Sequence, residues 1–148
     1  ICVISEDLAT THLILSLLKI QAEVDAISNE TCNIACLFLT LFEPKVISKG
    51  VEIPANIIDL GRCVEQRFKR VIRALGERTI IDTQVLLQQQ DCVESCLQDS
   101  IETQFYFATR HTAMIGRTLN LLAMIDALSH CVDHCNDIAQ EISRLIEK

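Results

Sequence analysis

The residues best suited to chemistry are two pairs of histidines and cysteines near the C-terminal end of the sequence. His130 and His134 stand four positions apart, and so do Cys131 and Cys135. Imidazole and thiolate groups are ligands for zinc and for softer ions such as Cu(I). On a helix the two pairs lie about 100° apart, so a single ion needs ligands from other helices to use them all. The cysteines also lie on an apolar seam, which favours core packing over metal binding.

The spacing of the eight cysteines disfavours disulfides. Six of them form pairs four positions apart, namely Cys32/Cys36, Cys92/Cys96 and Cys131/Cys135. One turn of helix separates Cβ atoms by about 5–6 Å, whereas a disulfide needs about 3.8 Å. We therefore expect reduced thiols and a cytoplasmic location. The alternative is a cysteine-lined helical bundle that binds or stores a soft metal such as Cu(I), because repeated pairs of this kind resemble those of copper-storage proteins.

The overall composition predicts an all-α protein. Of the 148 residues 49% are apolar and 22% are charged, and 4 Gly and 2 Pro are too few for the many turns of a β-sandwich. No apolar run approaches the roughly 20 residues of a membrane-spanning helix, so we expect a protein that is not embedded in a membrane. The net charge of −7 argues against binding to nucleic acid.

Turn and capping signals place the first two helical segments. Ser5 is expected to cap the first segment, which ends before Pro44 because the residue preceding a proline leaves the helical region. The second segment is expected to begin near Pro54, a residue suited to the first helical position, and to close at Gly76.

The third and fourth segments are separated by a less regular stretch. Thr79 with Asp82 resembles a capping box and opens the third segment. A break is expected near residues 109–112, before the fourth segment. The chain is therefore predicted to form four long helices.

The first and fourth segments carry matching apolar seams with heptad spacing. The first seam consists of Leu13, Leu17, Ile20, Val24, Ile27, Thr31, Ile34, Phe38 and Leu41. The fourth consists of Leu121, Met124, Leu128, Cys131, Cys135, Ile138, Ile142 and Leu145. A shift of 104 residues places every position from Leu17 to Leu41 on a position of the fourth seam. We interpret this agreement as an internal repeat.

Short segments within the two seams carry a family resemblance. Residues 24–35 read Val-Asp-Ala-Ile-Ser-Asn-Glu-Thr-Cys-Asn-Ile-Ala, and residues 128–140 read Leu-Ser-His-Cys-Val-Asp-His-Cys-Asn-Asp-Ile-Ala-Gln. Both resemble the signature helix of the PhoU family, regulators of bacterial phosphate uptake, which reads roughly Leu-Glu-Arg-Ile-Gly-Asp-His-Ala-x-Asn-Ile-Ala-Glu. Residues 91–94, Asp-Cys-Val-Glu, are similar to the Asp-x-Val-Asp stretch of the same family.

The resemblance implies a bundle of long antiparallel helices. Residues 1–45 would be the last helix of a first PhoU-like repeat, and residues 46–148 would be a PhoU-like three-helix bundle. The additional N-terminal helix makes this a four-helix bundle as the chain stands. Packing of that helix on the bundle and formation of a homodimer would each cover its apolar seam.

The resemblance also implies a metal site. PhoU proteins bind metal ions through an acid and an aspartate four residues apart in each signature helix. These positions hold Asp25 and Asn29 in the first copy and Ser129 and Asp133 in the second, so each copy lacks one acid. His134 follows Asp133 as histidine follows aspartate in the family, and it suits zinc. The candidate ligands for a divalent ion (Fe, Zn, Mn or Mg) are Asp25, Asn29, Asp133 and His134. The alternative is a polar stripe beside the seam.

A basic stretch in the second segment is a candidate for contact with a partner. Six bases and two acids lie between Arg62 and Arg78. Such a stretch is either a solvated helix face or a docking surface for an acidic partner, with Arg67, Arg70 and Arg73 as candidate contacts. The sequence has no Gly-rich phosphate loop, nucleophile elbow or Glu-x-x-His motif, so we expect no enzymatic activity. The resemblance implies an adaptor that docks from the cytoplasm onto a phosphate-transporter ATPase or a sensor kinase.

Overall fold

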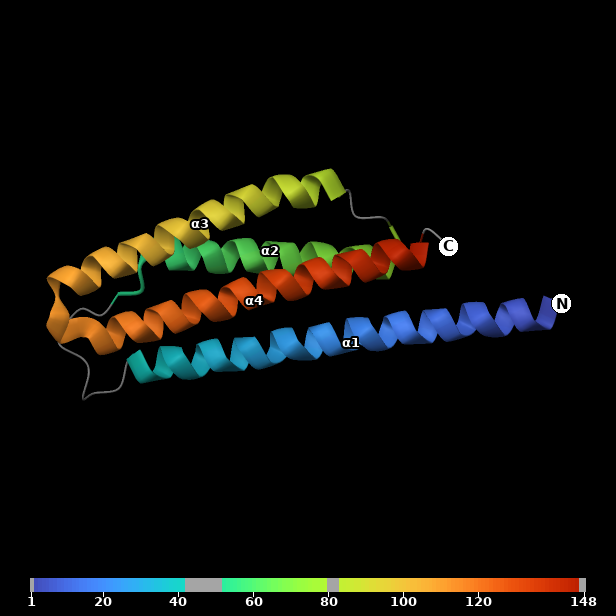
Figure 1. The fold of residues 1–148 in the computed structure, drawn as a ribbon, viewed down its shortest axis with the longest axis horizontal. Helices are drawn as coiled ribbons and strands as arrows, with labels where there is room; N and C mark the ends of the chain where they lie inside the picture. The colour runs from blue at the N-terminus through green and yellow to red at the C-terminus, as the bar shows by residue number, and fades with distance from the viewer. Residues whose placement is uncertain (1, 42–51, 80–82, 147–148) are drawn as a thin grey trace.

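A computed structural model describes the backbone of residues 2–41, 52–79 and 83–146, and the side chains of residues 8–41, 52–79, 90 and 92–146. Its elements are, in order, α1 (Cys2–Leu41), α2 (Ala55–Glu77), α3 (Thr83–Arg110), the short 3₁₀-helix η1 (Thr112–Met114) and α4 (Ile115–Ile146) (Figure 1). The described residues contain helices and no strand, which confirms the predicted all-α helical bundle. None of the described helices is long and apolar enough to cross a membrane.

The helices lie side by side around α4 (Figure 1). α4 contacts α1, α2 and α3, and α2 and α3 also contact each other. α1 makes close backbone contact with α4 alone among the described helices. It runs antiparallel to α4, and its N-terminal end extends beyond the other three helices. Three helices therefore pack mutually, and α1 lies along one side of them.

The seam predicted for the fourth segment forms the centre of the core. All of its positions from Leu121 to Ile142 are buried, and Cys135 and Ile138 have no exposed surface. The facing residues of α2 are Ile57, Leu60, Val64 and Val71, and these are buried as well. Removing this apolar surface from water is the main force that holds α2, α3 and α4 together.

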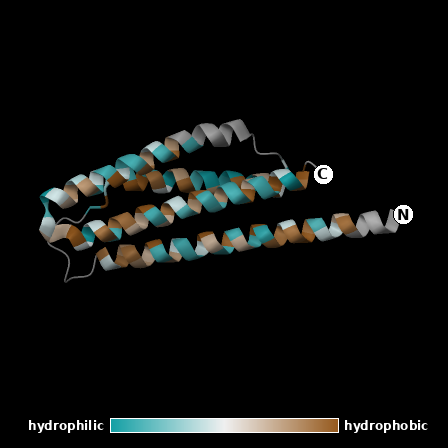
Figure 2. Ribbon diagram, viewed as in Figure 1, coloured by the Kyte–Doolittle hydropathy of each residue, from teal (hydrophilic) through white to brown (hydrophobic). Residues whose placement is uncertain are grey.

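The seam predicted for the first segment is covered only in part. Its buried positions are Ile20, Ile27 and Leu41. Leu13 and Leu17 are 48% and 45% exposed, and Phe38 is 42% exposed. Figure 2 shows that apolar residues continue along α1 into the part that extends beyond its neighbours. A helix with a single neighbour can bury only the side chains that this neighbour reaches.

Two predicted helix ends are corrected by the structure. α1 begins at Cys2, so Ser5 lies inside the helix and is not its cap. α2 continues past Gly76 to Glu77, and the left-handed residue that ends it is Arg78, with φ 51°. The next residue, Thr79, donates its backbone N–H to the carbonyl of Ala74 at 3.1 Å. This hydrogen bond satisfies a carbonyl of the last turn.

Other predicted boundaries agree more closely or fall outside the described residues. Pro54 directly precedes the first residue of α2, one position before the predicted place. The break near residues 109–112 is confirmed, because α3 ends at Arg110 and His111 is not helical. The predicted stop before Pro44 and the capping box that includes Asp82 fall on residues 42–51 and 80–82, which lie outside the described residues.

Candidate functional site

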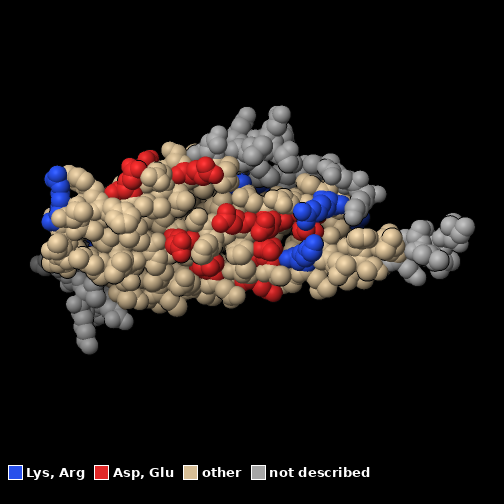
Figure 3. Space-filling model, viewed as in Figure 1, with Lys and Arg blue, Asp and Glu red and all other residues tan. Residues whose placement is uncertain are grey.

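Acidic side chains predominate on the face of the molecule shown in Figure 3. On α4 the exposed acids include Asp126, Asp133 and Asp137, and on α1 they include Asp25. Asp126, Asp133 and Asp137 recur after seven and four positions, so these three acids lie on one exposed side of α4. Such a surface repels anions and attracts cationic groups.

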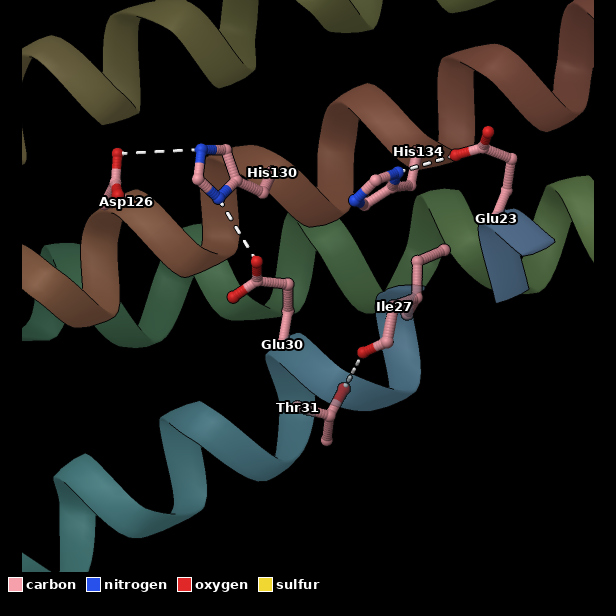
Figure 4. A network of polar contacts seen from close by, with 7 residues as sticks. All are labelled: Glu23, Ile27, Glu30, Thr31, Asp126, His130 and His134. Atoms are coloured by element: carbon pink, nitrogen blue, oxygen red, sulfur yellow. Dashed lines mark hydrogen bonds and ion pairs between the residues drawn. The ribbon is translucent and has the colours of Figure 1, made fainter. Parts of the chain in front are cut away.

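Two histidines of α4 contact glutamates of α1 across the interface of these helices (Figure 4). Nδ1 of His134 lies 2.6 Å from Oε2 of Glu23, and Nδ1 of His130 lies 3.2 Å from Oε1 of Glu30. Nε2 of His130 also lies 3.9 Å from Oδ1 of Asp126. The His134 and Glu23 side chains are 28% and 27% exposed. Both contacts connect α1 to α4, and each is strengthened when the imidazole is protonated.

The structure does not bring the four candidate metal ligands together into one site. Asp25, Asn29 and Asp133 are exposed, and Asp25 accepts a hydrogen bond of 2.9 Å from Nε2 of Gln21. His134 bonds to Glu23, which is not among the candidates. Within the described side chains, no group of three or more His, Cys, Asp or Glu residues is placed to hold a metal ion. The metal site therefore stays a prediction from the sequence.

Glu23 and Glu30 form contacts between helices that are not among the candidate residues of the sequence. Glu23 precedes the seam residue Val24, and Glu30 follows the seam residue Ile27 by three positions. Charged residues that flank a heptad seam commonly pair with the facing helix. Their seven-residue spacing was therefore a usable signal, but it becomes specific only once α4 is known to be the facing helix.

A third polar contact joins α1 and α4 near the end of the interface. Nζ of Lys19 lies 3.3 Å from Oε1 of Glu141, and Arg144 donates to the same carboxylate. Glu141 is only 6% exposed. Burial by itself would raise the pKa of Glu141, but the hydrogen bonds from Lys19 and Arg144 outweigh it and lower the pKa. The carboxylate is therefore charged at neutral pH and holds α1 against α4.

The three candidate contact residues in the basic stretch of α2 differ in their exposure. Arg67 is 3% exposed, so the prediction that it contacts a partner at the surface is wrong, whereas Arg70 and Arg73 are exposed. Nη2 of Arg67 donates to Oδ1 of Asn136, and Nδ2 of Asn136 donates in turn to Gln90 at 3.4 Å. Burial lowers the pKa of the Arg67 guanidinium. Nearby Cys135 and Asp133 act in the opposite direction.

Arg67 also lines a pocket between α2 and α3. The pocket has a volume of about 130 Å³ and is formed by Cys63, Gln66, Arg67, Cys92 and Val93. Cys63 lies close to both Cys92 and Cys96; burial and the nearby Cys92 raise the pKa of Cys63, whereas the contact with Cys96 acts in the opposite direction. The sequence spacing pairs Cys92 with Cys96, whereas the contact of Cys63 with them depends on how α2 and α3 pack.

The remaining cysteines fall into two environments. Cys131 and Cys135 are buried in the core, as their seam positions predict, and burial raises their thiol pKa values to about 11 and about 12. Cys32 and Cys36 are exposed on α1. All described cysteines are free thiols, which agrees with the expectation drawn from their spacing.

Comparison with known proteins adds no relative to these observations. No family model, no curated protein and no solved structure matches this chain. The PhoU resemblance therefore depends on the sequence segments alone.

Proposed function

We propose that the chain is a non-enzymatic regulatory adaptor of the PhoU type. It would act in the reducing cytoplasm and modulate phosphate uptake or signalling by docking onto a phosphate-transporter ATPase or a sensor kinase. The two signature-like segments support the proposal, as does a bundle whose long helices offer extended faces to a partner. The potential metal ion of this family would be a structural addition on α1 and α4, not part of the docking surface.

One observation favours a particular docking surface, the exposed face of α2. Arg62 and Lys69 each form an ion pair with an acid of the same helix, at 3.0 Å and 2.5 Å. Arg70 and Arg73 are exposed and form no ion pair with any described residue. Unpaired cations on a protein with a net charge of −7 are suited to an acidic partner surface.

The test is a binding measurement with purified partners. The ATPase subunit of a phosphate transporter, and separately the cytoplasmic part of a sensor kinase, are immobilised and titrated with the protein. The double variant Arg70→Glu with Arg73→Glu should bind at least about tenfold more weakly, since two attractive contacts become repulsive. Its affinity should also depend less on salt concentration, because screening acts on the charges that have been removed.

A matched control variant changes the net charge by the same amount at two other residues of the same helix. The double variant Arg62→Glu with Lys69→Glu introduces the same charge change at two cations that are already paired within α2. It should lose less affinity than the first variant. Equal losses in both variants would mean a general charge effect and would contradict docking through Arg70 and Arg73. Failure of the unaltered protein to bind either partner would overturn the adaptor proposal.

The alternative function, storage of a soft metal such as Cu(I), draws on the repeated cysteine pairs of the sequence. Cys63 lies close to Cys92 and Cys96, but these three thiols are not placed to hold a metal ion within the described side chains. Cys32 and Cys36 are exposed on α1, and Cys131 and Cys135 are buried in the core. Elemental analysis with a thiol count separates the two functions. Near-zero metal with all thiols titratable supports the adaptor. Several equivalents of copper, with thiols that react only after a chelator is added, would replace it with metal storage.

A further inference from the structure

An open apolar groove with a volume of about 250 Å³ lies between α3 and α4. Its apolar walls are formed by Leu97, Ile101 and Phe105 of α3 and by Leu122 and Ile125 of α4. The side chain of Phe105 is 59% exposed, so the groove is open to solvent. Covering such apolar surface with another apolar group is favourable, because it removes the surface from water.

The apolar surface continues beyond the groove along α4. Leu119 is 60% exposed and Ile115 is 48% exposed. Ile115, Leu119 and Leu122 follow one another after four and three positions, so they lie on one side of the helix. At 1.5 Å per residue, the stretch from Ile115 to Ser129 is about 20 Å long. This length matches about four turns of a second helix.

Exposed acids lie at both edges of the groove, and Figure 3 shows acidic side chains over α3 and over α4. On α4, Asp126 forms part of the groove wall, and its side chain is 73% exposed. On α3, Glu94 and Glu102 are exposed. They precede Leu97 and Phe105 by three positions, and residues at this spacing are neighbours on a helix surface. The groove is therefore apolar inside and acidic at its edges.

Few basic groups balance these acids. Residues 83–146 include eight acids and three bases. The three bases stand near the ends of α3 and α4, at Arg110, Arg117 and Arg144. Glu94 and Glu102 accept hydrogen bonds from neutral glutamine amides, and Asp126 lies 3.9 Å from Nε2 of His130. The edges of the groove therefore attract a cationic partner.

We propose that this surface, here named the α3–α4 groove, binds a basic amphipathic helix of another protein. A helix that lies between two others places side chains from every third and fourth position into the groove. Its aliphatic side chains would cover Phe105 and the neighbouring leucines, and its flanking Lys and Arg residues would lie near the acids of both edges. A cation can also stack on the exposed ring of Phe105.

The size of the groove favours a peptide over a small molecule. Pockets that hold drug-sized molecules have volumes of roughly 300–1,000 Å³ and enclose most of the ligand. The α3–α4 groove is smaller, at about 250 Å³, and one of its walls is the largely exposed Phe105. It suits a few anchoring side chains of a longer helix.

The proposed partner differs from the partner of the adaptor proposal. The exposed cations Arg70 and Arg73 of α2 suit an acidic surface, whereas the α3–α4 groove suits a basic one. The inference goes beyond the adaptor function and depends on other residues, so each can fail without the other.

The experiment measures the binding of two synthetic peptides by fluorescence anisotropy. The first is a fluorescein-labelled helix of about 18 residues with leucines along one side and lysines on both flanks of that side. The second has the same composition, but its leucines are distributed around the helix. The first peptide should bind at least about tenfold more tightly, and its affinity should fall as salt is added. Equal affinities, or no binding of the first peptide at about 1 mM, would overturn the proposal.

Variants of exposed residues locate the binding surface without disturbing the fold. Phe105→Ala should weaken binding of the first peptide by at least about tenfold, because it removes an aromatic anchor. Tyr106→Ala is the matched control, since Tyr106 is 60% exposed on the same helix and is not part of the groove wall. It should change the affinity by less than about twofold. Equal losses in the two variants would contradict binding in the groove.

A charge-reversal pair tests the acidic edge in the same way. Asp126→Lys should weaken binding by about tenfold and reduce its dependence on salt. Asp99→Lys makes the same charge change at an exposed acid of α3 that does not line the groove, and it should lose less affinity. Equal losses in both variants would mean a general charge effect and would overturn the proposal.

Crosslinking and light scattering distinguish the remaining possibilities. A benzophenone in place of one leucine of the first peptide should crosslink to residues 97–105 and 115–129. Crosslinks confined to α1 or α2 would contradict the proposal. Light scattering of the protein without peptide tests whether a second copy of the chain occupies the groove instead. A dimer that Phe105→Ala dissociates would assign the groove to that copy and overturn the proposal.

Discussion

α1 and α4 carry nearly the same apolar pattern and bury it to different extents. Their seams coincide after a shift of 104 residues. On α4 the seam is buried from Leu121 to Ile142, whereas Leu13 and Leu17 of the α1 seam remain about half exposed. Within the described part of the chain, α4 packs against α1, α2 and α3, whereas α1 makes close backbone contact with α4 alone. Heptad spacing therefore determines where the apolar stripe runs on a helix, and the number of neighbours determines how much of it is covered.

The polar residues beside the two seams differ in kind and complement each other. α1 contributes Glu23 and Glu30, and α4 contributes His134 and His130. After the shift of 104 residues, His134 corresponds to Glu30 and His130 corresponds to Ala26. The polar contacts between α1 and α4 are therefore made by residues in which the two helices differ.

The largest expected difference between α1 and α4 is the reactivity of their cysteines. Alkylation by iodoacetamide at pH 8, followed residue by residue by mass spectrometry, should be fast at the exposed Cys32 and Cys36. It should be about two to three powers of ten slower at Cys131 and Cys135, because their raised pKa values of about 11 and about 12 leave little thiolate. Burial slows these two further.

Denatured protein supplies the control for this measurement. In urea all four cysteines should react at similar rates. Rates at Cys131 and Cys135 that match that of Cys32 in the native protein would show that the α4 seam is open to solvent, contrary to the core described here.

Truncating one seam residue in each helix should produce the next largest difference. Ile138→Ala removes a side chain with no exposed surface and should cost about 3 kcal/mol of unfolding free energy, from lost burial and the cavity left behind. Leu13→Ala acts at a side chain that is 48% exposed and should stay within about 0.5 kcal/mol. Urea unfolding followed by circular dichroism measures both.

The same pair of variants tests the homodimer that the sequence left open. Leu13 and Leu17 line an apolar groove of about 520 Å³ together with residues of α2 and α4. If a second copy of the chain covers this groove, Leu13→Ala should lower the free energy of unfolding by far more than about 0.5 kcal/mol. The loss should then also depend on protein concentration. Light scattering at several concentrations distinguishes the two cases.

The core seams could be predicted from the sequence because helix period alone places them. The same reasoning extended to Arg67 would have placed it correctly: it lies three residues after Val64 and four before Val71, on the buried stripe of α2. Counting charge over the whole basic stretch ignored this periodicity and treated Arg67 as equivalent to Arg70.

Contacts between distant segments could not be predicted in this way. The partner of His134 is 111 positions away in the sequence, and the thiols around Cys63 belong to another helix. Neither contact follows from local spacing, because each depends on the direction and rotation of one helix against another. The C-terminal end of α2 could not be predicted either, because Arg78 adopts the left-handed conformation that is usually found at glycine.

Alkaline pH should destabilise the protein through the α4 cysteines. Burial raises the pKa of Cys131 from 9.0 to about 11 and that of Cys135 from 9.0 to about 12. Because the folded state favours the neutral thiols, their contribution is complete below about pH 9 and is lost as pH rises toward the folded values. At pH 10 the loss of this contribution should lower the free energy of unfolding by about 1.4 kcal/mol for each thiol.

The matched variant for alkaline unfolding is Cys131→Ala with Cys135→Ala. Its unfolding free energy should fall less steeply between pH 9 and about pH 11 than that of the unaltered protein, although it starts lower because two core side chains are truncated. Identical slopes would mean that the two thiols ionise as readily in the folded state as in the unfolded one.

The smallest expected effect concerns the contact that joins the two helices directly. A double-mutant cycle of Glu23→Ala and His134→Ala should give a coupling free energy of about 0.5 kcal/mol at pH 7, since both side chains are partly exposed and water weakens the interaction.

Hydrogen exchange distinguishes this contact from an ordinary surface pair, because Glu23 and His134 belong to different helices. Their loss should speed exchange in α1 near Glu23 and leave α2 unchanged. The pair Glu65 and Lys69, at 2.5 Å within α2, is the matched control, and its removal should not affect α1. An unchanged exchange rate in α1 after Glu23→Ala would mean that the apolar seam alone holds this helix, and that the acids and histidines beside it contribute nothing to its attachment.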